Sequence, residues 1–292
     1  MRGVCEALAG CGVVTSALEE LAETVSDAGP CSIEGSGSLT AFRCDTPSAQ
    51  TIKVNLAGIF ELDAADQVVE VWAGTTFTEL QQELAKHGQC LPFAGFSLRP
   101  FTSLEGVAGT VGGQLSMNLP HAFEADCGTW RDWVLGMTVV LADGRVAKSG
   151  SRVVKNVTGY DVHRFFVGAR GALGVVARVA LRIFPLKALP NLDLLPNPGY
   201  REKGFIQRTL PADFEAAMAA CQELGGANPK TNTLYSLGSS PPKRFRGDWI
   251  IGWGQGKTNL PPATGPSAGY LQKAKQVFDP DGKLNRDAFP TA

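Results

Sequence analysis

The sequence predicts an α+β protein, and three features carry this prediction. Short runs rich in Val, Ile and Thr alternate with a few amphipathic helices in the first part of the chain. Segments dense in glycine separate these runs. At 292 residues, with 44% hydrophobic and 19% charged residues, the chain is long enough for one large core or two ordinary domains. The pattern of amino acids in the chain changes after Pro185, so we expect the first domain to cover residues 1–186.

Three helices are expected in this first domain. Residues 14–28 place apolar and acidic side chains on opposite faces. A second helix is expected to open after Thr76 and to end at Gly88. Its apolar stripe, spaced i, i+3 and i+7, consists of Phe77, Leu80 and Leu84. Residues 161–170 are the third expected helix.

The expected strands are runs of β-branched and other apolar residues. The turn 142–145, Ala-Asp-Gly-Arg, predicts a hairpin that leads into a short strand at 146–148. The other expected strands lie at 31–33, 51–56, 68–73, 133–141 and 175–184.

Fewer elements are expected after residue 186, so we predict a shortened, partly irregular segment over 187–292. One amphipathic helix is expected there, and its apolar stripe, which includes Phe214 and Leu224, is interpreted as core packing. The Gly-, Pro- and Ser-rich stretches are interpreted as loops or disorder. The expected order is a connector at 187–200, the helix at 211–224, loops at 225–248, one strand at 249–253 and loops at 254–269.

Composition and charge exclude several classes of function. A formal net charge of -1 means that the chain has no excess of positive charge for binding nucleic acid or an anionic membrane. The longest apolar run, 133–141, is too short to span a bilayer, so no transmembrane segment is expected. The first residues make a poor secretory signal.

Metal sites and disulfides are not expected either. The seven cysteines are scattered without a Cys-x-x-Cys pair, which argues against zinc, iron–sulfur ligation and a disulfide framework. The three histidines also lie far apart in the sequence. Unpaired thiols indicate a reducing compartment, so we expect a cytoplasmic protein.

Three glycine-rich segments have the chemistry of a dinucleotide cradle. Glycine lets backbone N–H groups approach a ligand that a Cβ would exclude, and successive N–H groups with serine hydroxyls can hold a phosphate. By itself, the first segment is explained equally well as a flexible surface turn. No Gly-x-Gly-x-x-Gly lies between a strand and a helix, which argues against a Rossmann site. The segments are Gly35–Ser38, Gly109–Asn118 and Gly171–Val176.

The glycine-rich run 106–113, the run Lys155–Asp161 and Gly171–Val176 follow one another in an order that resembles the flavin-binding domain of the vanillyl-alcohol oxidase and p-cresol methylhydroxylase (PCMH) superfamily. The run Lys155–Asp161 is nearly that of the flavin-binding E subunits of bacterial glycolate oxidases. The resemblance covers about residues 30–187 and resumes at 270–285, where Phe278-Asp279-Pro280 begins a closing motif. It implies a PCMH-type FAD-binding domain of two packed α/β subdomains, with a shortened C-terminal cap segment that returns to the flavin domain near 270–285.

The resemblance also implies which residues hold FAD. The first segment would grip the pyrophosphate, the second would line the pyrophosphate and ribityl chain, and the third would contact the adenine and flavin ends. Leu39 stands where relatives often have Lys. No His lies near the first segment, so FAD is expected to be non-covalent, unlike in covalent oxidases of the superfamily. The residues implied are Gly35, Ser36, Gly37, Ser38, Gly109, Thr110, Gly112, Gly113, Asn118, Thr129, Asp132, Gly174 and Val176.

Two functions are compatible with these features of the sequence. The resemblance implies an FAD-dependent oxidoreductase, or its flavin-binding subunit, which acts on a 2-hydroxy acid such as glycolate or D-lactate. It further implies a hetero-oligomer with another flavoprotein and an iron–sulfur subunit. No catalytic residue is assigned, because no His follows His163 and the region for substrate is short. The alternative, favoured by Leu39 and that short region, is a non-catalytic scaffold with weak or no FAD binding.

Overall fold

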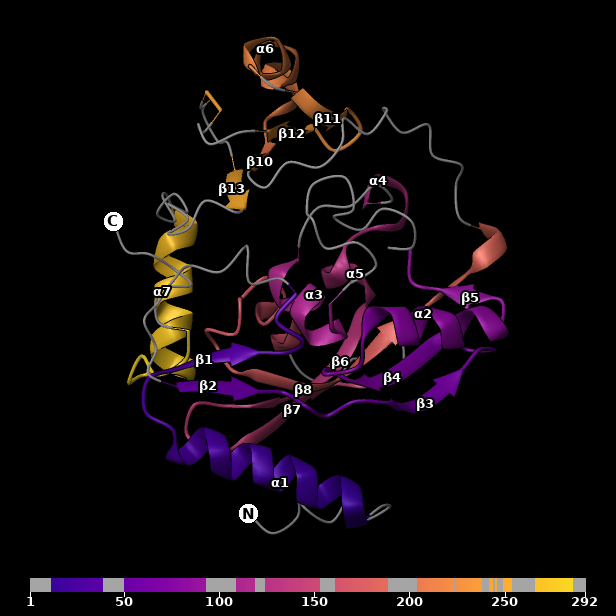
Figure 1. Ribbon diagram of the computed structural model, residues 1–292, viewed down its shortest axis with the longest axis vertical. Helices are drawn as coiled ribbons and strands as arrows, with labels where there is room; N and C mark the ends of the chain where they lie inside the picture. The colour runs from indigo at the N-terminus through magenta and orange to yellow at the C-terminus, as the bar shows by residue number, and fades with distance from the viewer. Residues whose placement is uncertain are drawn as a thin grey trace.

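The computed structural model mixes helices and strands throughout its length, which confirms the α+β fold class (Figure 1). The residues that it describes are 12–38, 50–92, 109–118, 124–152, 161–188, 204–222, 224–237, 242–243, 245, 249–253 and 266–285. The division of the chain at residue 186 stays a prediction.

A five-stranded antiparallel sheet forms the centre of the larger part of the molecule. Its order is β3-β4-β8-β6-β7, so β8 lies between β4 and β6. Every residue of β8 from Val175 to Leu181 is buried, as expected for a central strand that is covered on both faces. The strands are β3 (Ile59–Asp63), β4 (Val68–Trp72), β6 (Val134–Val140), β7 (Val146–Gly150) and β8 (Val175–Arg182).

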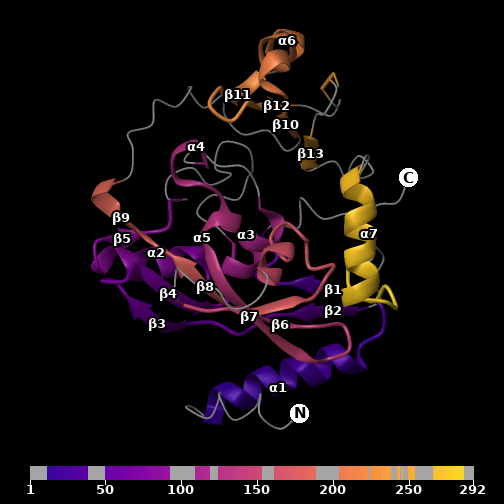
Figure 2. The same cartoon turned by 180° about the vertical axis from the view of Figure 1, so that it is seen from behind.

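A second, smaller pair of strands lies beside this sheet. β1 (Cys31–Glu34) and β2 (Gln50–Lys53) run parallel, and Leu284 forms a bridge to Cys31 on β1. The long helix α7 (Pro266–Phe278) lies at one end of these strands and runs across their direction in both views (Figure 1, Figure 2). Residues far apart in the sequence therefore meet at β1.

Helices cover the sheet and connect its strands. α2 opens with a capping box, in which Thr76 and Glu79 exchange hydrogen bonds, so the expected helix start is confirmed. β5 (Gln89–Cys90), which follows α2 in the sequence, pairs with β9 (Phe184–Pro185). The helices of this part are α1 (Gly12–Asp27), α2 (Phe77–Lys86), α3 (Val111–Met117), α4 (Glu124–Cys127), α5 (Trp130–Trp133) and the short 3-10 helices Val162–Phe165 and Leu186–Ala188.

The C-terminal region contains a four-stranded antiparallel sheet with the order β11-β12-β10-β13. Figure 1 and Figure 2 place this small sheet at the end of the molecule opposite α1. Helix α6 covers it with Phe214 and Ala217, which pack on Leu234. Its elements are β10 (Gly204–Arg208), the 3-10 turn Pro211–Asp213, α6 (Phe214–Ala220), β11 (Leu224–Asn228), β12 (Thr233–Leu237) and β13 (Trp249–Trp253).

Two details expected of the C-terminal region are wrong, namely the length of its helix and the loops at the start of 225–248. The helix expected at 211–224 ends at Ala220, because Cys221 is extended and a Gly pair follows, and glycine disfavours a helix interior. Leu224 is half-exposed at the start of β11 and does not pack in a helical stripe. Strands β11 and β12 lie where loops were expected, since pairing along the sheet overrides the low strand propensity of Gly and Asn. The expected strand at 249–253 is confirmed.

Three further expectations need correction. Only Val162–Phe165 of the helix expected at 161–170 is helical, because Gly168 and Arg170 adopt positive φ angles that end it. The edge strand β3 was not expected. Helix α7 begins inside the loop expected at 254–269, with Pro266 in its first turn. The family-like run at 155–160, Leu39, residues 189–200 of the connector and residues 254–265 lie outside the described residues.

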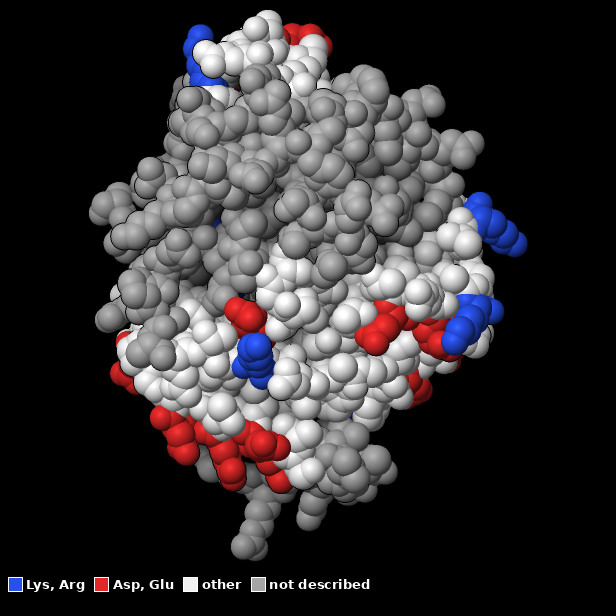
Figure 3. Space-filling model, in the orientation of Figure 1, with Lys and Arg blue, Asp and Glu red and all other residues white. Residues whose placement is uncertain are grey.

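The surface shown in Figure 3 carries a group of acidic side chains over α1. They are exposed on the face of the helix that points away from the core, and they are Glu19, Glu20, Glu23 and Asp27. This face lacks the positive charge that nucleic acid or an anionic membrane requires. Within the described residues, no helix combines the length and apolar character needed to cross a membrane.

Candidate functional site

The first glycine segment is a short loop that follows β1. Gly37 has φ 77°, a left-handed conformation that glycine adopts without steric cost. The hydroxyls of Ser36 and Ser38 lie 2.9 Å apart on the loop. No described residue accepts a hydrogen bond from the backbone N–H groups of Ser36 to Ser38. The loop therefore offers several donors, from backbone and hydroxyl groups, on four consecutive small residues.

The second segment begins with a turn and continues as helix α3. Gly109 has φ 71°, and Thr110 is the N-cap residue whose hydroxyl accepts the Gly113 N–H at 3.1 Å. The N–H groups of Val111 and Gly112 donate to the carbonyls of Thr75 and Ala73, at 2.9 and 2.8 Å. The amides at this helix N-terminus are therefore occupied within the protein.

Gly112 is also required for packing. A Cβ on Gly112 would lie 2.8 Å from the Cβ of Ala73, which is closer than two non-bonded carbon atoms approach each other. The absence of a side chain at this position thus lets α3 sit against the end of β4. Asn118 ends the helix in a left-handed conformation with φ 44°, which asparagine tolerates better than most residues.

The first and second segments are in direct contact. A Cβ on Gly35 would overlap the hydroxyl oxygen of Thr110, with the Thr110 Cβ only 3.3 Å away. The two segments are separated by more than seventy residues, roughly 250 Å of extended chain, so only the tertiary fold unites them.

A turn at 168–172, which leads into the third segment, touches the second segment and the strand that leads into the first. The N–H groups of Gly168 and Arg170 donate to the carbonyls of Leu115 and Ser116 at the end of α3, at 3.0 and 2.9 Å. A Cβ on Gly171 would lie 3.3 Å from the Ile33 Cβ on β1. The structure thus brings the first two segments into contact, and it places the turn that leads into the third segment against α3 and β1.

Gly174 and Val176 have a different environment from the loops. A Cβ on Gly174 would lie 2.9 Å from the Phe166 ring and 3.1 Å from the Val140 carbonyl oxygen. Val176 is buried within β8. Both residues therefore pack in the core beneath the converging segments.

Thr129 and Asp132 form a local cap. The Asp132 carboxylate accepts the Thr129 N–H at 2.8 Å and the Thr129 hydroxyl at 2.9 Å. This cap starts the short helix α5, whose Trp130 and Trp133 are fully buried. The direct role of the pair is therefore to orient two core tryptophans, and Asp132 itself is exposed.

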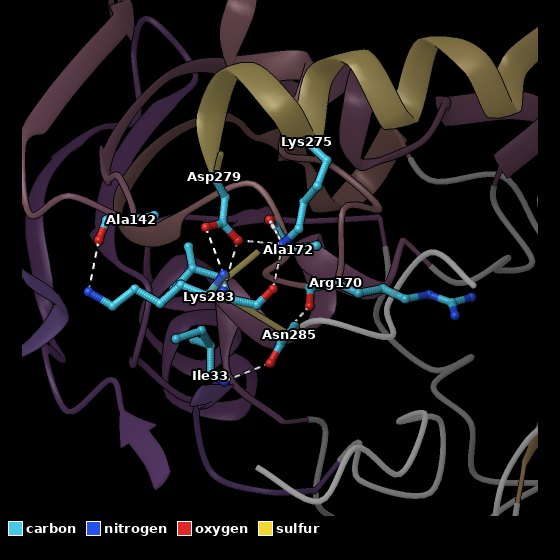
Figure 4. Close-up of polar contacts among 9 residues, drawn as sticks. Ile33, Ala142, Arg170, Ala172, Lys275, Asp279, Lys283 and Asn285 are labelled. Atoms are coloured by element: carbon cyan, nitrogen blue, oxygen red, sulfur yellow. Dashed lines mark hydrogen bonds and ion pairs between the residues drawn. The ribbon is translucent and has the colours of Figure 1, made fainter. Parts of the chain in front are cut away.

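The closing segment of the chain connects several of these elements (Figure 4). Asp279 is almost completely buried and accepts the N–H groups of Lys283 and Leu284, at 2.9 and 2.8 Å. Lys275 donates to the Asp279 carboxylate at 2.5 Å and to the Ala172 carbonyl at 2.7 Å. The sequence indicated this motif, but the individual roles of its side chains were not expected, because their partners lie far away in the chain.

Titratable groups in the described residues provide no evident acid–base pair. Burial raises the pKa of the Cys90 thiol to about 11, and it also raises the pKa of Cys127. Thiols of this kind are poor nucleophiles at neutral pH. The described cysteines are free, and no group of His, Cys, Asp and Glu among the described residues is arranged to hold a metal ion.

Comparison with known families decides what this arrangement belongs to. Residues 11–150, which include the first two segments, match the FAD binding domain family. Residues 11–150 are an FAD-binding domain. The resemblance to PCMH-type flavin domains drawn from the sequence is thereby confirmed.

Relatives of this FAD-binding domain include three named proteins. Glycolate oxidase subunit GlcE of Escherichia coli is 31% identical over 176 residues, which are 60% of this chain and 48% of the relative. D-lactate dehydrogenase of Archaeoglobus fulgidus is 34% identical over 138 residues, 47% of this chain and 29% of the relative. Glycolate oxidase subunit GlcD of Bacillus subtilis is 29% identical over 127 residues, which are 44% of this chain and 25% of the relative. The match spans less than half the length of each relative.

Proposed function

We propose that this chain binds FAD non-covalently where its three glycine-rich segments meet, and that it is the flavin-binding subunit of an oxidoreductase. The observation that carries this proposal is the contact of Gly35 with Thr110, together with the contacts of the 168–172 turn with the end of α3 and with Ile33 on the strand that leads into the first segment. The proposed substrate is a 2-hydroxy acid such as glycolate or D-lactate, which the names of the relatives support.

The residues of the first segment fit a pyrophosphate. Gly35 to Ser38 present backbone N–H and hydroxyl donors, contain no carboxylate and carry no side chain larger than serine. Thr110 and Asn118 would border the cofactor from the second segment, while Gly112, Gly174 and Val176 would support the site from below. FAD, when bound, supplies the hydride acceptor for oxidation of the 2-hydroxy acid.

The proposed subunit works in a larger assembly. Two of the relatives are named as subunits of glycolate oxidase, which supports a hetero-oligomer. We extend this to an assembly with another flavoprotein and an iron–sulfur subunit, placed in the cytoplasm or at a membrane through its partners. Co-purification from the source, with flavin and iron quantified, tests this assembly.

The flavin proposal is tested by cofactor content. The purified chain, alone or after incubation with FAD, should hold about one FAD per chain, and acid precipitation should release it to the supernatant. Flavin retained in the pellet would contradict non-covalent binding. Gly37→Ala should weaken binding, since alanine is strained at φ 77°. Gly88→Ala is the matched control, because Gly88 has φ 64°, lies after α2, and would have no neighbouring atom within 4 Å of an added Cβ.

A second candidate function is a flavin-free accessory subunit. The occupied amides at the start of α3 favour it, because they are not available to a phosphate. A colourless protein that stays folded and takes up no added FAD would support this function and would contradict the first proposal.

A further inference from the structure

The segment Lys283–Asn285 lies against the edge of β1 and hydrogen-bonds to it. The Cys31 N–H donates to the Lys283 carbonyl at 2.8 Å, and the Asn285 N–H donates to the Cys31 carbonyl at 2.9 Å. Asp279 holds this segment in place by accepting the N–H groups of Lys283 and Leu284. Asn285 is therefore fixed immediately beside the strand that leads into the first glycine segment.

The side chain of Asn285 joins that strand to the 168–172 turn (Figure 4). Its Oδ1 accepts the Ile33 N–H at 2.9 Å, and its Nδ2 donates to the Arg170 carbonyl oxygen. Ile33 precedes Gly35 on one side, and Arg170 precedes Gly171 on the other. One amide thus connects the strand that leads into the first segment with the turn that leads into the third.

The space, the backbone conformation and the hydrogen-bond partners at position 285 favour asparagine over other residues. A Cβ on Gly171 would lie 2.6 Å from the Asn285 Nδ2, so only glycine at 171 leaves room for this amide. Asn285 has φ 35°, a left-handed conformation in which asparagine and glycine are the least strained residues. The amide also supplies one acceptor and one donor, whereas an ionised aspartate supplies acceptors only.

We propose that Asn285 is a positioning residue for FAD, which sets the separation of the Gly35–Ser38 loop from the 168–172 turn. The inference rests on the proposed flavin function. Since a cofactor that spans two segments binds best when their separation is fixed beforehand, loss of this bridge weakens FAD binding without removing any group that touches FAD.

The test uses two substitutions in the full chain. Asn285→Gly keeps the backbone conformation and deletes both hydrogen bonds, so the dissociation constant for FAD should rise about tenfold. Asn285→Asp keeps the acceptor for Ile33 and loses the donor to Arg170, so its effect should be intermediate. In the FAD-free protein, hydrogen exchange should become faster in residues 31–38 and 168–172 of the Gly variant.

Lys283→Met is the matched control from the same segment. Lys283 donates to the carbonyls of Ser26 and Ala142, at 2.7 and 3.1 Å, away from the three glycine-rich segments. This variant should lower the melting temperature and leave the FAD dissociation constant unchanged. If the FAD dissociation constant rose equally in Asn285→Gly and Lys283→Met, the positioning role would be overturned. A general destabilisation of the segment would then explain the weaker binding.

The outcomes separate this inference from the proposed function. Wild-type protein that binds FAD, with an unchanged dissociation constant in Asn285→Gly, overturns the inference and leaves the function standing. Wild-type protein that binds no FAD overturns both. If the Gly variant does not fold, the Asp variant decides: wild-type affinity overturns the inference, and weaker binding with faster exchange in the two segments supports it.

Discussion

Gly35 packs directly against Thr110, so that a single methyl group at position 35 would overlap the threonine hydroxyl. The same hydroxyl caps helix α3 through the Gly113 N–H. The first loop and the first turn of α3 therefore share one atom as a neighbour. This contact is the reason that two glycine-rich segments, distant in the sequence, form one surface.

Gly35→Ala tests that contact. It should lower the free energy of unfolding by about 1–3 kcal/mol, because the new Cβ must displace Thr110. Thr110→Ala should cost about 1 kcal/mol through loss of the cap. In the double variant the nearest remaining Thr110 atom is the Cβ, at 3.3 Å, so the two losses should not add. Urea unfolding of the four proteins measures this coupling, and strictly additive losses would contradict the packing described.

Asp279→Asn tests the closing segment. The substitution leaves the Lys275 ammonium without its carboxylate at a site where Asp279 is 1% exposed. Breaking a buried pair in this way should cost about 3 kcal/mol, seen as a lower urea midpoint. Asp281→Asn, on the exposed side of the same turn, should change stability by less than about 0.5 kcal/mol. Equal effects of the two substitutions would argue against the buried role of Asp279.

The small C-terminal sheet is joined to α4 by two ion pairs of unequal burial. Arg208 binds Glu124 through two hydrogen bonds, at 2.9 and 2.6 Å, and the Glu124 side chain is only 12% exposed. A double-mutant cycle with Arg208→Met and Glu124→Gln should give a coupling of about 1–2 kcal/mol. The pair Lys230–Asp126, in which Lys230 is 58% exposed, should give less than about 0.5 kcal/mol. A coupling for the first pair no larger than for the second would show that the bidentate contact does not hold the sheet to α4.

Buried His163 should make stability depend on pH. Burial lowers its pKa from the ordinary value of 6.5, an effect that Arg164 strengthens and Asp161 opposes. Because the unfolded chain takes up the proton first, the free energy of unfolding should fall as the pH drops below 6.5. His163→Gln should reduce this fall.

Melting temperatures between about pH 7.5 and about pH 5.5 measure the effect of His163. His87→Gln is the control, since the His87 side chain is 48% exposed. The prediction fails if His163→Gln retains the wild-type decrease.

Local sequence patterns were sufficient for much of the larger part of the molecule. Helix α2 follows from its apolar spacing and its Thr76 cap, and the β6–β7 hairpin follows from Asp143-Gly144. These features depend on neighbours within a few residues, so the sequence displays them directly. In the C-terminal region, β11 has little strand propensity and forms because β12 pairs with it, a partner that local patterns do not reveal.

For the candidate site, the sequence by itself determined which segments are glycine-rich and which known domain they resemble. Only the tertiary structure decided what each residue does there. It placed Gly35 on Thr110, turned the amides of α3 toward Thr75 and Ala73, and put Asn285 between Ile33 and Arg170. The physical reason is that a glycine pattern records where a side chain is excluded, whereas the atom that excludes it is contributed by a distant part of the chain.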